Sequence, residues 1–318
     1  MAAPSGFVPG WSYQPQSIEA IRNEFAAEGL PVSFADGRPD LKDYHKQFVR
    51  SSICESELKL FGKFLDSWTQ ARGTCVSQGT GRACQFSNYA AIVKGVIAGD
   101  PLQIAAEPIY GGSRVNIGGG QLGGGDGSIG AWAARYVHKY GIHCKAVYGR
   151  YDLSKPNEMV GVNWGMPRQG VPDEVLNDPR VRKGIRAFEC QTIEQVWDAL
   201  CADSACALCC NTLFSGQRDR NGCLRPSGNG GHCTGLVDYV VAKNGEPITI
   251  YQQSWGNGAI SGHDEIECKD GSIYKLGPGR CGIYLDDMKR CVRDGGSELW
   301  CFSASNPWTD GVKPGEYL

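Results

Sequence analysis

The apolar residues recur at helical spacing in the first half of the chain and in strand-like runs in the second half. Helical patterns cover residues 17–30, 56–68, 84–97 and 128–140, and a short one with a capping box starts at Thr192. Apolar runs bounded by Gly, Asn and Asp turns then cover residues 205–214, 233–242, 247–255 and 279–285. This order predicts an α+β chain in which a helical half precedes a β-rich half, with the boundary near residue 175.

Composition and charge exclude several classes of protein. The 318 residues are 41% hydrophobic and 21% charged, and the formal net charge is −2. That balance gives no attraction to nucleic acid or to an anionic membrane. No apolar run is long enough to span a bilayer, and residues 1–16 lack the basic start and apolar stretch of a secretory signal. We expect a protein made in the cytosol that binds neither nucleic acid nor membrane.

The fifteen cysteines and the glycine tract need separate interpretation. Residues 201–210 contain four cysteines, but no second ligand pair or histidine stands near them at metal-ligand spacing, so we expect core or disulfide cysteines and no metal. The glycine-rich residues 111–130 lack the Gly-Lys-Ser/Thr of a phosphate loop. We expect this tract to be non-helical and to offer a bare backbone edge to an extended peptide.

The sequence pattern indicates one cysteine, Cys84, as a candidate nucleophile. Cys84 precedes an apolar stripe, which predicts that it lies in the first turn of a helix, where unpaired N–H groups and the helix dipole stabilise a thiolate. Gln78, six residues earlier, offers an amide for a developing oxyanion. Among the five histidines, His232 is the best general base, because it follows a glycine turn at the start of an apolar strand. The alternative for Cys84 is a small buried core residue.

These segments resemble those of papain-like cysteine peptidases. The similar stretches, in chain order, are LDSWTQARG (65–73), VSQGTGRACQFS (76–87), GGDGSIGAWAARYVHKYGIHCKAVY (124–148), GHCTGLVDY (231–239) and PITIYQQSWGNG (247–258). The separation of Cys84 and His232, 232 − 84 = 148 residues, lies in the range of roughly 130–150 residues for that family. The resemblance covers about residues 65–285.

The resemblance implies a papain-like two-lobed fold. Residues 65–175 would form a helical left lobe and residues 176–318 a β-barrel-like right lobe, with the cleft between them. It also implies hydrolysis of a peptide or protein substrate through a thioester, without metal or organic cofactor. The residues implied for catalysis are Cys84, His232, Gln78 and Gln253, the last orienting His232 with support from Ser254. The residues implied for substrate binding are Gly125, Gly127, Ser128 and Trp255.

The sequence also departs from the family. Gln85 stands where the family has Trp after its nucleophile, Gly81 stands where it has Cys, and Gln253 stands where it has Asn. The alternative is therefore a weakened or inactive papain-fold module that binds protein partners in a large assembly such as a virus particle. Residues 1–64 would be either a pro-segment across the cleft or a docking arm that packs elsewhere.

Overall fold

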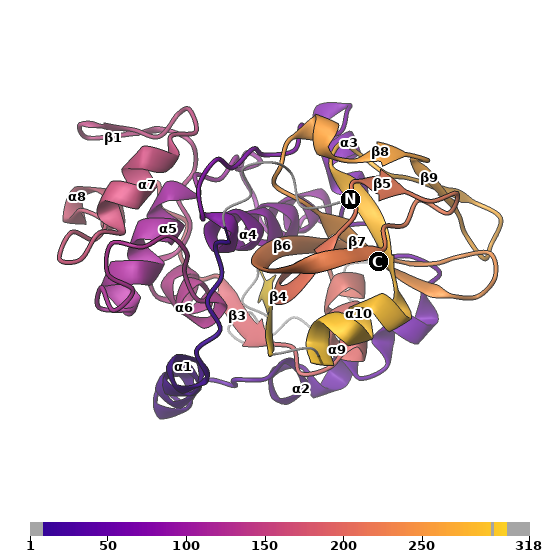
Figure 1. Cartoon of the computed structure of the whole chain (residues 1–318), viewed down its shortest axis with the longest axis horizontal. Coiled ribbons are helices and arrows are strands. Elements are labelled where there is room, and N and C mark those ends of the chain that lie inside the picture. Colours follow the sequence, from indigo (N-terminus) through magenta and orange to yellow (C-terminus); the bar gives the residue numbers. More distant parts are fainter. Residues whose placement is uncertain (1–8, 294–295, 304–318) are drawn as a thin grey trace.

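The chain folds into a group of helices and a six-stranded sheet, with one long helix, α4, between them (Figure 1). The structure is a computed structural model that describes residues 9–293 and 296–303. The helical lobe contains α4 (Cys75–Val93), α5 (Glu107–Gly112), η3 (Ser113–Ile117), α6 (Gly130–Tyr140), α7 (Glu158–Trp164) and α8 (Asp173–Leu176), with the hairpin β1 (Val147–Tyr148) and β2 (Tyr151–Asp152). The predicted α+β class is confirmed.

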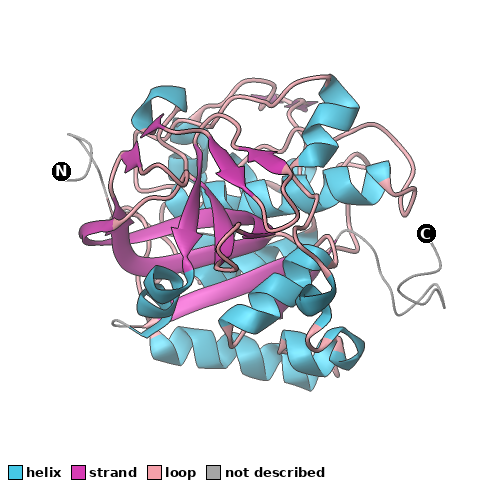
Figure 2. Ribbon diagram, turned by 90° about the vertical axis from the view of Figure 1, so that its right-hand side faces the viewer, coloured by secondary structure: helices cyan, strands magenta, loops and turns pink. Residues whose placement is uncertain are grey.

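The six-stranded sheet is antiparallel and has the order β11-β7-β6-β4-β12-β3. Its strands are β3 (Arg186–Glu189), β4 (Cys206–Phe214), β6 (Pro226–Val241), β7 (Pro247–Gln252), β11 (Arg280–Tyr284) and β12 (Ser297–Ser303). Helices α4, α9 (Ile193–Cys201) and α10 (Leu285–Arg293) pack on it. Figure 2 shows helices below and behind the strands. Because helices cover them, the central strands read as continuous apolar runs. Shorter strands β5 (Gln217–Arg218), β8 (Ser261–Gly262), β9 (Glu265–Glu267) and β10 (Ile273–Lys275) and the turn η4 (Asn257–Ala259) lie outside this sheet.

Residues 9–64 are built into the body of the protein. They form α1 (Pro15–Ala27), α2 (Phe34–Gly37), η1 (Pro39–Leu41), η2 (Tyr44–Gln47) and α3 (Glu55–Phe61). The buried Asp198 of α9 accepts hydrogen bonds from the backbone N–H of His45 and bonds its Nδ1, at 2.9 and 2.6 Å. The buried Asp238 of β6 accepts from the N–H groups of Ile53 and Cys54 at 2.9 and 3.0 Å. Residues 45–54 therefore supply hydrogen bonds to two buried carboxylates of the sheet half.

An ion pair without solvent access also joins this region to the sheet. Glu57 of α3 bonds the guanidinium of Arg280 on β11, and their side chains are 0% and 1% exposed. The Arg280 cation lies over the rings of Phe64 and Phe86, 4.9 Å from each centroid. Removing residues 1–64 would leave the Arg280 charge buried without its carboxylate.

We expect Glu57→Gln to lower the free energy of unfolding by about 3–5 kcal/mol, because it leaves a buried charge uncompensated. The measurement is denaturant unfolding at pH 7. Glu55→Gln is the matched control: its partner Arg50 is 31% exposed, so the change should stay within about 1 kcal/mol. Equal losses in the two variants would contradict a structural role for the Glu57–Arg280 pair.

Several predicted elements are confirmed. Helices α1, α6 and α9 occupy the expected segments, and the Thr192 hydroxyl caps α9 by accepting from the N–H of Gln195 at 3.2 Å. The apolar runs of the second half form β4, β6, β7 and β11. The helix predicted over residues 56–68 ends at Phe61.

The predicted start of the nucleophile helix is wrong. Helix α4 begins at Cys75, so Cys84 is its tenth residue and does not lie in the first turn. The helix continues through Gly79 because a side chain there would collide with β6: a Cβ would lie 2.9 Å from the Cys233 sulfur. Close packing of helix on strand thus requires glycine inside a helix, against its low helical propensity.

The expectation that residues 111–130 are non-helical is wrong for the first part of the tract. Residues 111–117 belong to α5 and η3. Glycine is needed at position 112 of this helix because a Cβ there would lie 1.9 Å from the ring of Tyr136. The buried Arg114 donates to the carbonyls of Gly165 and Gly123 at 3.0 and 2.8 Å, which holds the turns that follow.

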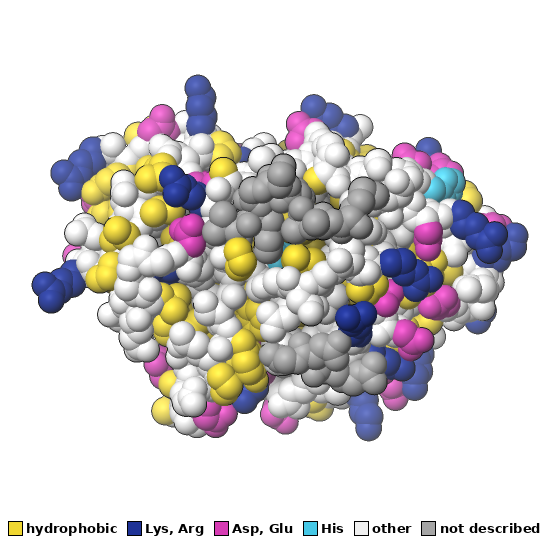
Figure 3. Space-filling view, viewed as in Figure 1, with side chains coloured by type: hydrophobic (Ala, Val, Ile, Leu, Met, Phe, Trp, Pro, Cys, Tyr) yellow, Lys and Arg dark blue, Asp and Glu magenta, His cyan; other side chains and the backbone are white. Residues whose placement is uncertain are grey.

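Charges of both signs are interspersed on the face shown in Figure 3, and apolar side chains show at its left, over the helical lobe. Among the helices in residues 9–293 and 296–303, none has the length and apolar character needed to cross a membrane.

Candidate active site

Cys75 is the first residue of α4 and its side chain is buried. Its sulfur interacts with the backbone of Cys233, the residue that follows His232, and with the backbone of Gly10. The N-terminus of α4 and the central strand β6 thus bring a thiol beside the histidine segment. A thiol at a helix N-terminus is favoured as a thiolate when water or a base can reach it.

The ring of His232 is held against an indole. Its centroid lies 4.7 Å from that of Trp255, and the two rings are inclined by 21°. Trp255 follows β7 and pairs with Thr69 in an isolated β-bridge. Next to this bridge, the N–H of Gln70 donates to the carbonyl of Ser254 at 2.9 Å, and the Ser254 hydroxyl bonds the Gln70 amide oxygen. The loop that leads to Cys75 is therefore docked against the turn that carries Trp255.

The amide of Gln253 bonds the backbone of its own turn. Its Nε2 donates to the carbonyl of Gly256 at 2.7 Å, and its Oε1 accepts from the N–H of Trp255. The carbonyl of Gln253 accepts from the Ser67 hydroxyl at 2.7 Å. Gln253 thus holds the turn in which Trp255 stands.

Residues 9–12, which we name the strap, lie between the helical lobe and the sheet (Figure 1). The N–H of Gly10 donates to the carbonyl of Gly231 at 3.1 Å. Across the cleft, the N–H of Ser128 donates to the carbonyl of Gly10 at 2.9 Å, and the N–H of Ser12 donates to the carbonyl of Ser128 at 3.0 Å. An extended segment of the chain is therefore bonded on both sides of Cys75, in the manner of strand addition.

Two further features hold the strap. The indole of Trp11 donates at 2.7 Å to Glu298, a buried carboxylate of β12 that also accepts from the N–H of Gly130 at the start of α6. Gly10 fits without any spare room: a Cβ there would lie 2.5 Å from the carbonyl oxygen of Gly73 and 2.7 Å from the sulfur of Cys75. Only a glycine allows the backbone to pass this close to the thiol.

Burial keeps both reactive groups neutral in this closed arrangement. It raises the pKa of the Cys75 thiol above its ordinary value, with a further increase from the neighbouring Cys233. Burial also lowers the pKa of His232 to about 3. Neither the thiolate nor the imidazolium is therefore favoured while the strap is in place.

The other predicted site residues occupy different surroundings. Cys84 lies about 14 Å further along α4 than Cys75, at 1.5 Å of rise per residue, and burial raises the pKa of its thiol. Gln78 lines a cavity within the helical lobe. Gly125 is exposed, whereas the N–H of Gly127 donates to the Tyr110 hydroxyl at 3.2 Å. Of the three residues predicted in the glycine tract, Ser128 is the one that pairs with the strap.

Sequence reasoning missed Cys75, Gln70 and Gly10. A usable signal was present, because the nucleophile of the resembled family opens the central helix, and Cys75 directly follows Gly73 and Thr74. The longer separation from His232, 232 − 75 = 157 residues, and the Gln-Gly pair before Cys84 directed the prediction to Cys84.

The cysteines and acidic groups form no metal site among residues 9–293 and 296–303: no group of three or more His, Cys, Asp or Glu side chains is placed to hold an ion. All fifteen cysteines lie in this part of the chain, and all are free thiols.

No protein-family model and no curated protein sequence matches the chain. Several solved structures do match the chain. The proform of the Amb a 11 cysteine protease, a major ragweed pollen allergen, is 16% identical with a TM-score of 0.50, over 82% of this chain and 67% of that one. Xylellain, a cysteine protease from Xylella fastidiosa, is 12% identical with a TM-score of 0.49, over 95% and 93%. Digestive procathepsin L 3 of Tenebrio molitor larval midgut is 15% identical with a TM-score of 0.46, over 92% and 94%. The chain therefore has the two-lobed fold of the papain-like cysteine proteases, as its sequence motifs predict.

Proposed function

We propose that the protein is a cysteine peptidase in which Cys75 is the nucleophile, His232 is the general base, and the strap holds the enzyme latent. One observation supports this above the others: residues 10–12 form an extended peptide, bonded to both lobes, with Gly10 against the sulfur of Cys75. A peptide backbone therefore passes beside the Cys75 thiol and the segment that carries His232, as a bound substrate would.

The proposed reaction starts from the neutral Cys75 thiol and the neutral His232 imidazole. When a substrate replaces the strap, the Cys75 thiol transfers its proton to His232, and the sulfur attacks the carbonyl carbon of the scissile bond. The C–N bond breaks as the imidazolium returns that proton to the leaving amine. Water, deprotonated by the neutral imidazole, then attacks the thioester, and the released sulfur takes back a proton.

The residues around this pair have supporting roles in the proposal. The N–H of Cys75 belongs to the first turn of α4, and the Gln70 amide, whose Nε2 donates to the carbonyl of Arg72 at 3.1 Å, stands on the loop before it; the Cys75 N–H and the second Nε2 hydrogen of Gln70 stabilise the oxyanion. Trp255 fixes the plane of the His232 ring by stacking. Gln253 acts as a positioning residue, because it holds the turn of Trp255 through two backbone bonds.

The strap and the rest of the N-terminal region divide the two roles foreseen for residues 1–64. Residues 9–12 would act as the blocking pro-segment. Residues 45–57 would act as a permanent structural arm, because they satisfy Asp198, Asp238 and Arg280 in the core. Activation then requires release of the strap alone, and removal of all residues before Leu65 should unfold the protein.

Acid should favour release of the strap. In the closed form the pKa of His232 is about 3, whereas a solvated imidazole has a pKa near 6.5. The stability that the closed form gains over the open form from neutral His232 is therefore complete above about pH 6.5. It is lost as the pH falls toward 3, because only the open form readily takes up the proton.

The measurement is hydrogen–deuterium exchange of the strap amides between pH 7.5 and 4.5, corrected for intrinsic exchange rates. We expect opening to increase toward pH 4.5 in the wild type and to lose most of this dependence in His232→Gln. A wild-type profile that is flat with pH, or one that His232→Gln leaves unchanged, would reject this form of latency.

The test of the proposed activity is hydrolysis of a fluorogenic peptide library with the strap displaced. Loss of hydrolysis in Cys75→Ala and its retention in Cys84→Ala would support the proposal. If the displaced form binds peptides and its Cys75 is alkylated, yet no peptide is cleaved, the alternative of an inactive binding module holds.

A further inference from the structure

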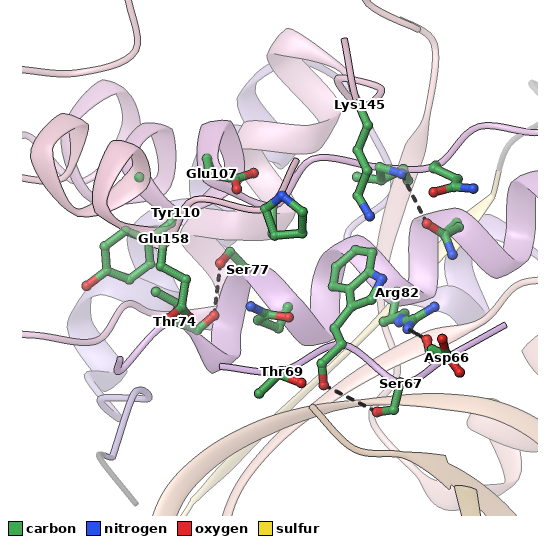
Figure 4. Close-up of a pocket in the computed structure, with 18 of the residues that line it drawn as sticks. Asp66, Ser67, Thr69, Thr74, Ser77, Arg82, Glu107, Tyr110, Lys145 and Glu158 are labelled. Carbon is green, nitrogen blue, oxygen red and sulfur yellow. Dashed lines mark hydrogen bonds between the residues drawn. The ribbon is translucent and has the colours of Figure 1, made fainter. Parts of the chain in front are cut away.

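The cavity that Gln78 lines has a volume of about 470 Å³ and lies in the helical lobe, and neither Cys75 nor His232 lines it. Its walls come from residues 65–69, the outer side of α4, the start of α5, and α7 (Figure 4). The volume is within the range of sites that bind small organic molecules, and exceeds what a single amino acid would fill. Charged and polar side chains stand among the apolar ones in its lining.

One side of the cavity is cationic. The Arg82 guanidinium is 2% exposed, donates to the carbonyl of Asp66 at 2.6 Å, and lies 4.4 Å from the ring centroid of Trp68. The Lys145 ammonium lies 5.7 Å from the same ring and points into the cavity in Figure 4. Within residues 9–293 and 296–303, this ammonium forms no hydrogen bond or ion pair, and Glu107 is the carboxylate that acts on it electrostatically. Burial lowers the pKa of Lys145 and lowers that of Arg82 to about 10, so both cations lack sufficient solvation.

The opposite side is acidic. Glu107 is 7% exposed, and its Oε1 accepts from the N–H of Asn157 at 2.6 Å. Glu158 accepts from the N–H of Ala71 at 2.8 Å and from the Thr74 hydroxyl. Figure 4 shows both carboxylates across the cavity from Lys145 and Arg82. Burial raises the pKa of Glu107 even though the charge of Lys145 opposes this shift, and a further cation close to the carboxylate would lower it.

A buried polar atom on the cavity wall also lacks a partner. The amide oxygen of Gln78 has no hydrogen bond, and this side chain is 6% exposed and lines the cavity. The Nε of the buried Arg82 likewise has no acceptor. Leaving such groups unsatisfied costs free energy that a polar ligand would recover.

We propose that this cavity is a binding site for a small zwitterion of about the size of a dipeptide. Its carboxylate lies between Lys145 and Arg82, and its ammonium lies toward Glu107 and Glu158. The Trp68 indole supplies an apolar wall for the part of the ligand between the two charges. The amide oxygen of Gln78 accepts a hydrogen bond from the bound molecule. The proposal needs no peptidase activity, because it rests on residues outside the Cys75–His232 pair.

The experiment is an NMR titration of the full chain with the dipeptide Gly-Leu, with its N-acetyl form, which lacks the ammonium, and with its C-terminal amide, which lacks the carboxylate. The spectra also show that each probe remains intact. We expect Gly-Leu to bind at least about tenfold more tightly than either blocked form, since each loses a charge-assisted hydrogen bond.

Two variants test which charged end of the ligand binds at each side of the cavity. Lys145→Met should bind Gly-Leu and its amide about equally, and Glu107→Gln should bind Gly-Leu and its N-acetyl form about equally. The glutamine oxygen can still accept from Asn157, so the fold is retained. Lys139→Met is the matched control, because Lys139 also lies over an aromatic ring, 5.3 Å from that of Tyr140, but outside the cavity.

Three outcomes overturn the proposal. One is the absence of binding by all three probes. Another is equal binding of Gly-Leu and its N-acetyl form by the wild type, which would mean a site for a simple anion. The third is Gly-Leu affinity that Lys145→Met and Glu107→Gln leave unchanged, which would place the dipeptide elsewhere, in the cleft included.

Discussion

Cys75→Ala should abolish peptide hydrolysis, lowering kcat by a factor on the order of 10⁴ or more, whereas Cys84→Ala should keep most of it. The difference follows from where the two thiols lie on α4. Cys75 opens the helix beside the His232 segment, and Cys84 lies nine residues further along, in the core. Removing a nucleophile leaves only the contributions of oxyanion donors and binding.

The measurement uses both variants in a background with the strap displaced, and follows hydrolysis together with thermal unfolding. Cys84→Ala removes one buried sulfur, so a modest loss of stability is expected there, without a matching loss of kcat. Cys75→Ala also removes a buried sulfur, so a comparable modest loss of stability is expected there, together with the loss of kcat. A fully folded Cys84→Ala variant without activity would restore Cys84 as the nucleophile, and activity in Cys75→Ala would refute the proposed role of Cys75.

Gly10→Ala should release the strap and increase the rate at which iodoacetamide alkylates Cys75 by roughly tenfold to a hundredfold. The added methyl group would meet the carbonyl oxygen of Gly73 at 2.5 Å and the sulfur of Cys75 at 2.7 Å. Overpacking of this kind costs about 1–3 kcal/mol, and it destabilises only the closed form, in which the strap lies against Cys75. The open population, and with it the reactivity of Cys75, rises by the corresponding factor.

Alkylation at pH 7.5, with the labelled cysteine identified by mass spectrometry, measures this effect. Gly228→Ala is the matched control, since a Cβ at Gly228 meets no atom within 4 Å. A second variant, Trp11→Phe, removes the indole donor to Glu298 and should act in the same direction as Gly10→Ala. If both strap variants label Cys75 no faster than the Gly228→Ala control, the strap does not protect the thiol.

The clearest predictions from sequence concern elements whose pattern is local. The helix over residues 128–140 and the apolar runs of the second half are visible because burial imposes a period on each of them. The motif around His232 lies within the single strand β6, so its place there needed no information from distant parts of the chain, although the glycines expected to form a turn before His232 belong to the strand itself. The papain-like fold was therefore predictable from the chain alone, and the structure confirms it.

The sequence by itself determined the α+β architecture, the order of its elements and the strand that carries His232. Only the tertiary structure decided where α4 begins, because Gly79 and Gly81, which oppose a helix locally, are required there by β6 and by the ring of Trp68. The partnership of Cys75 with the His232 segment, and the passage of Gly10 over that thiol, also depend on contacts between residues far apart in the chain. Such contacts produce no periodic pattern in the sequence. A close approach between two backbones requires one small residue at one position, and no other position repeats it.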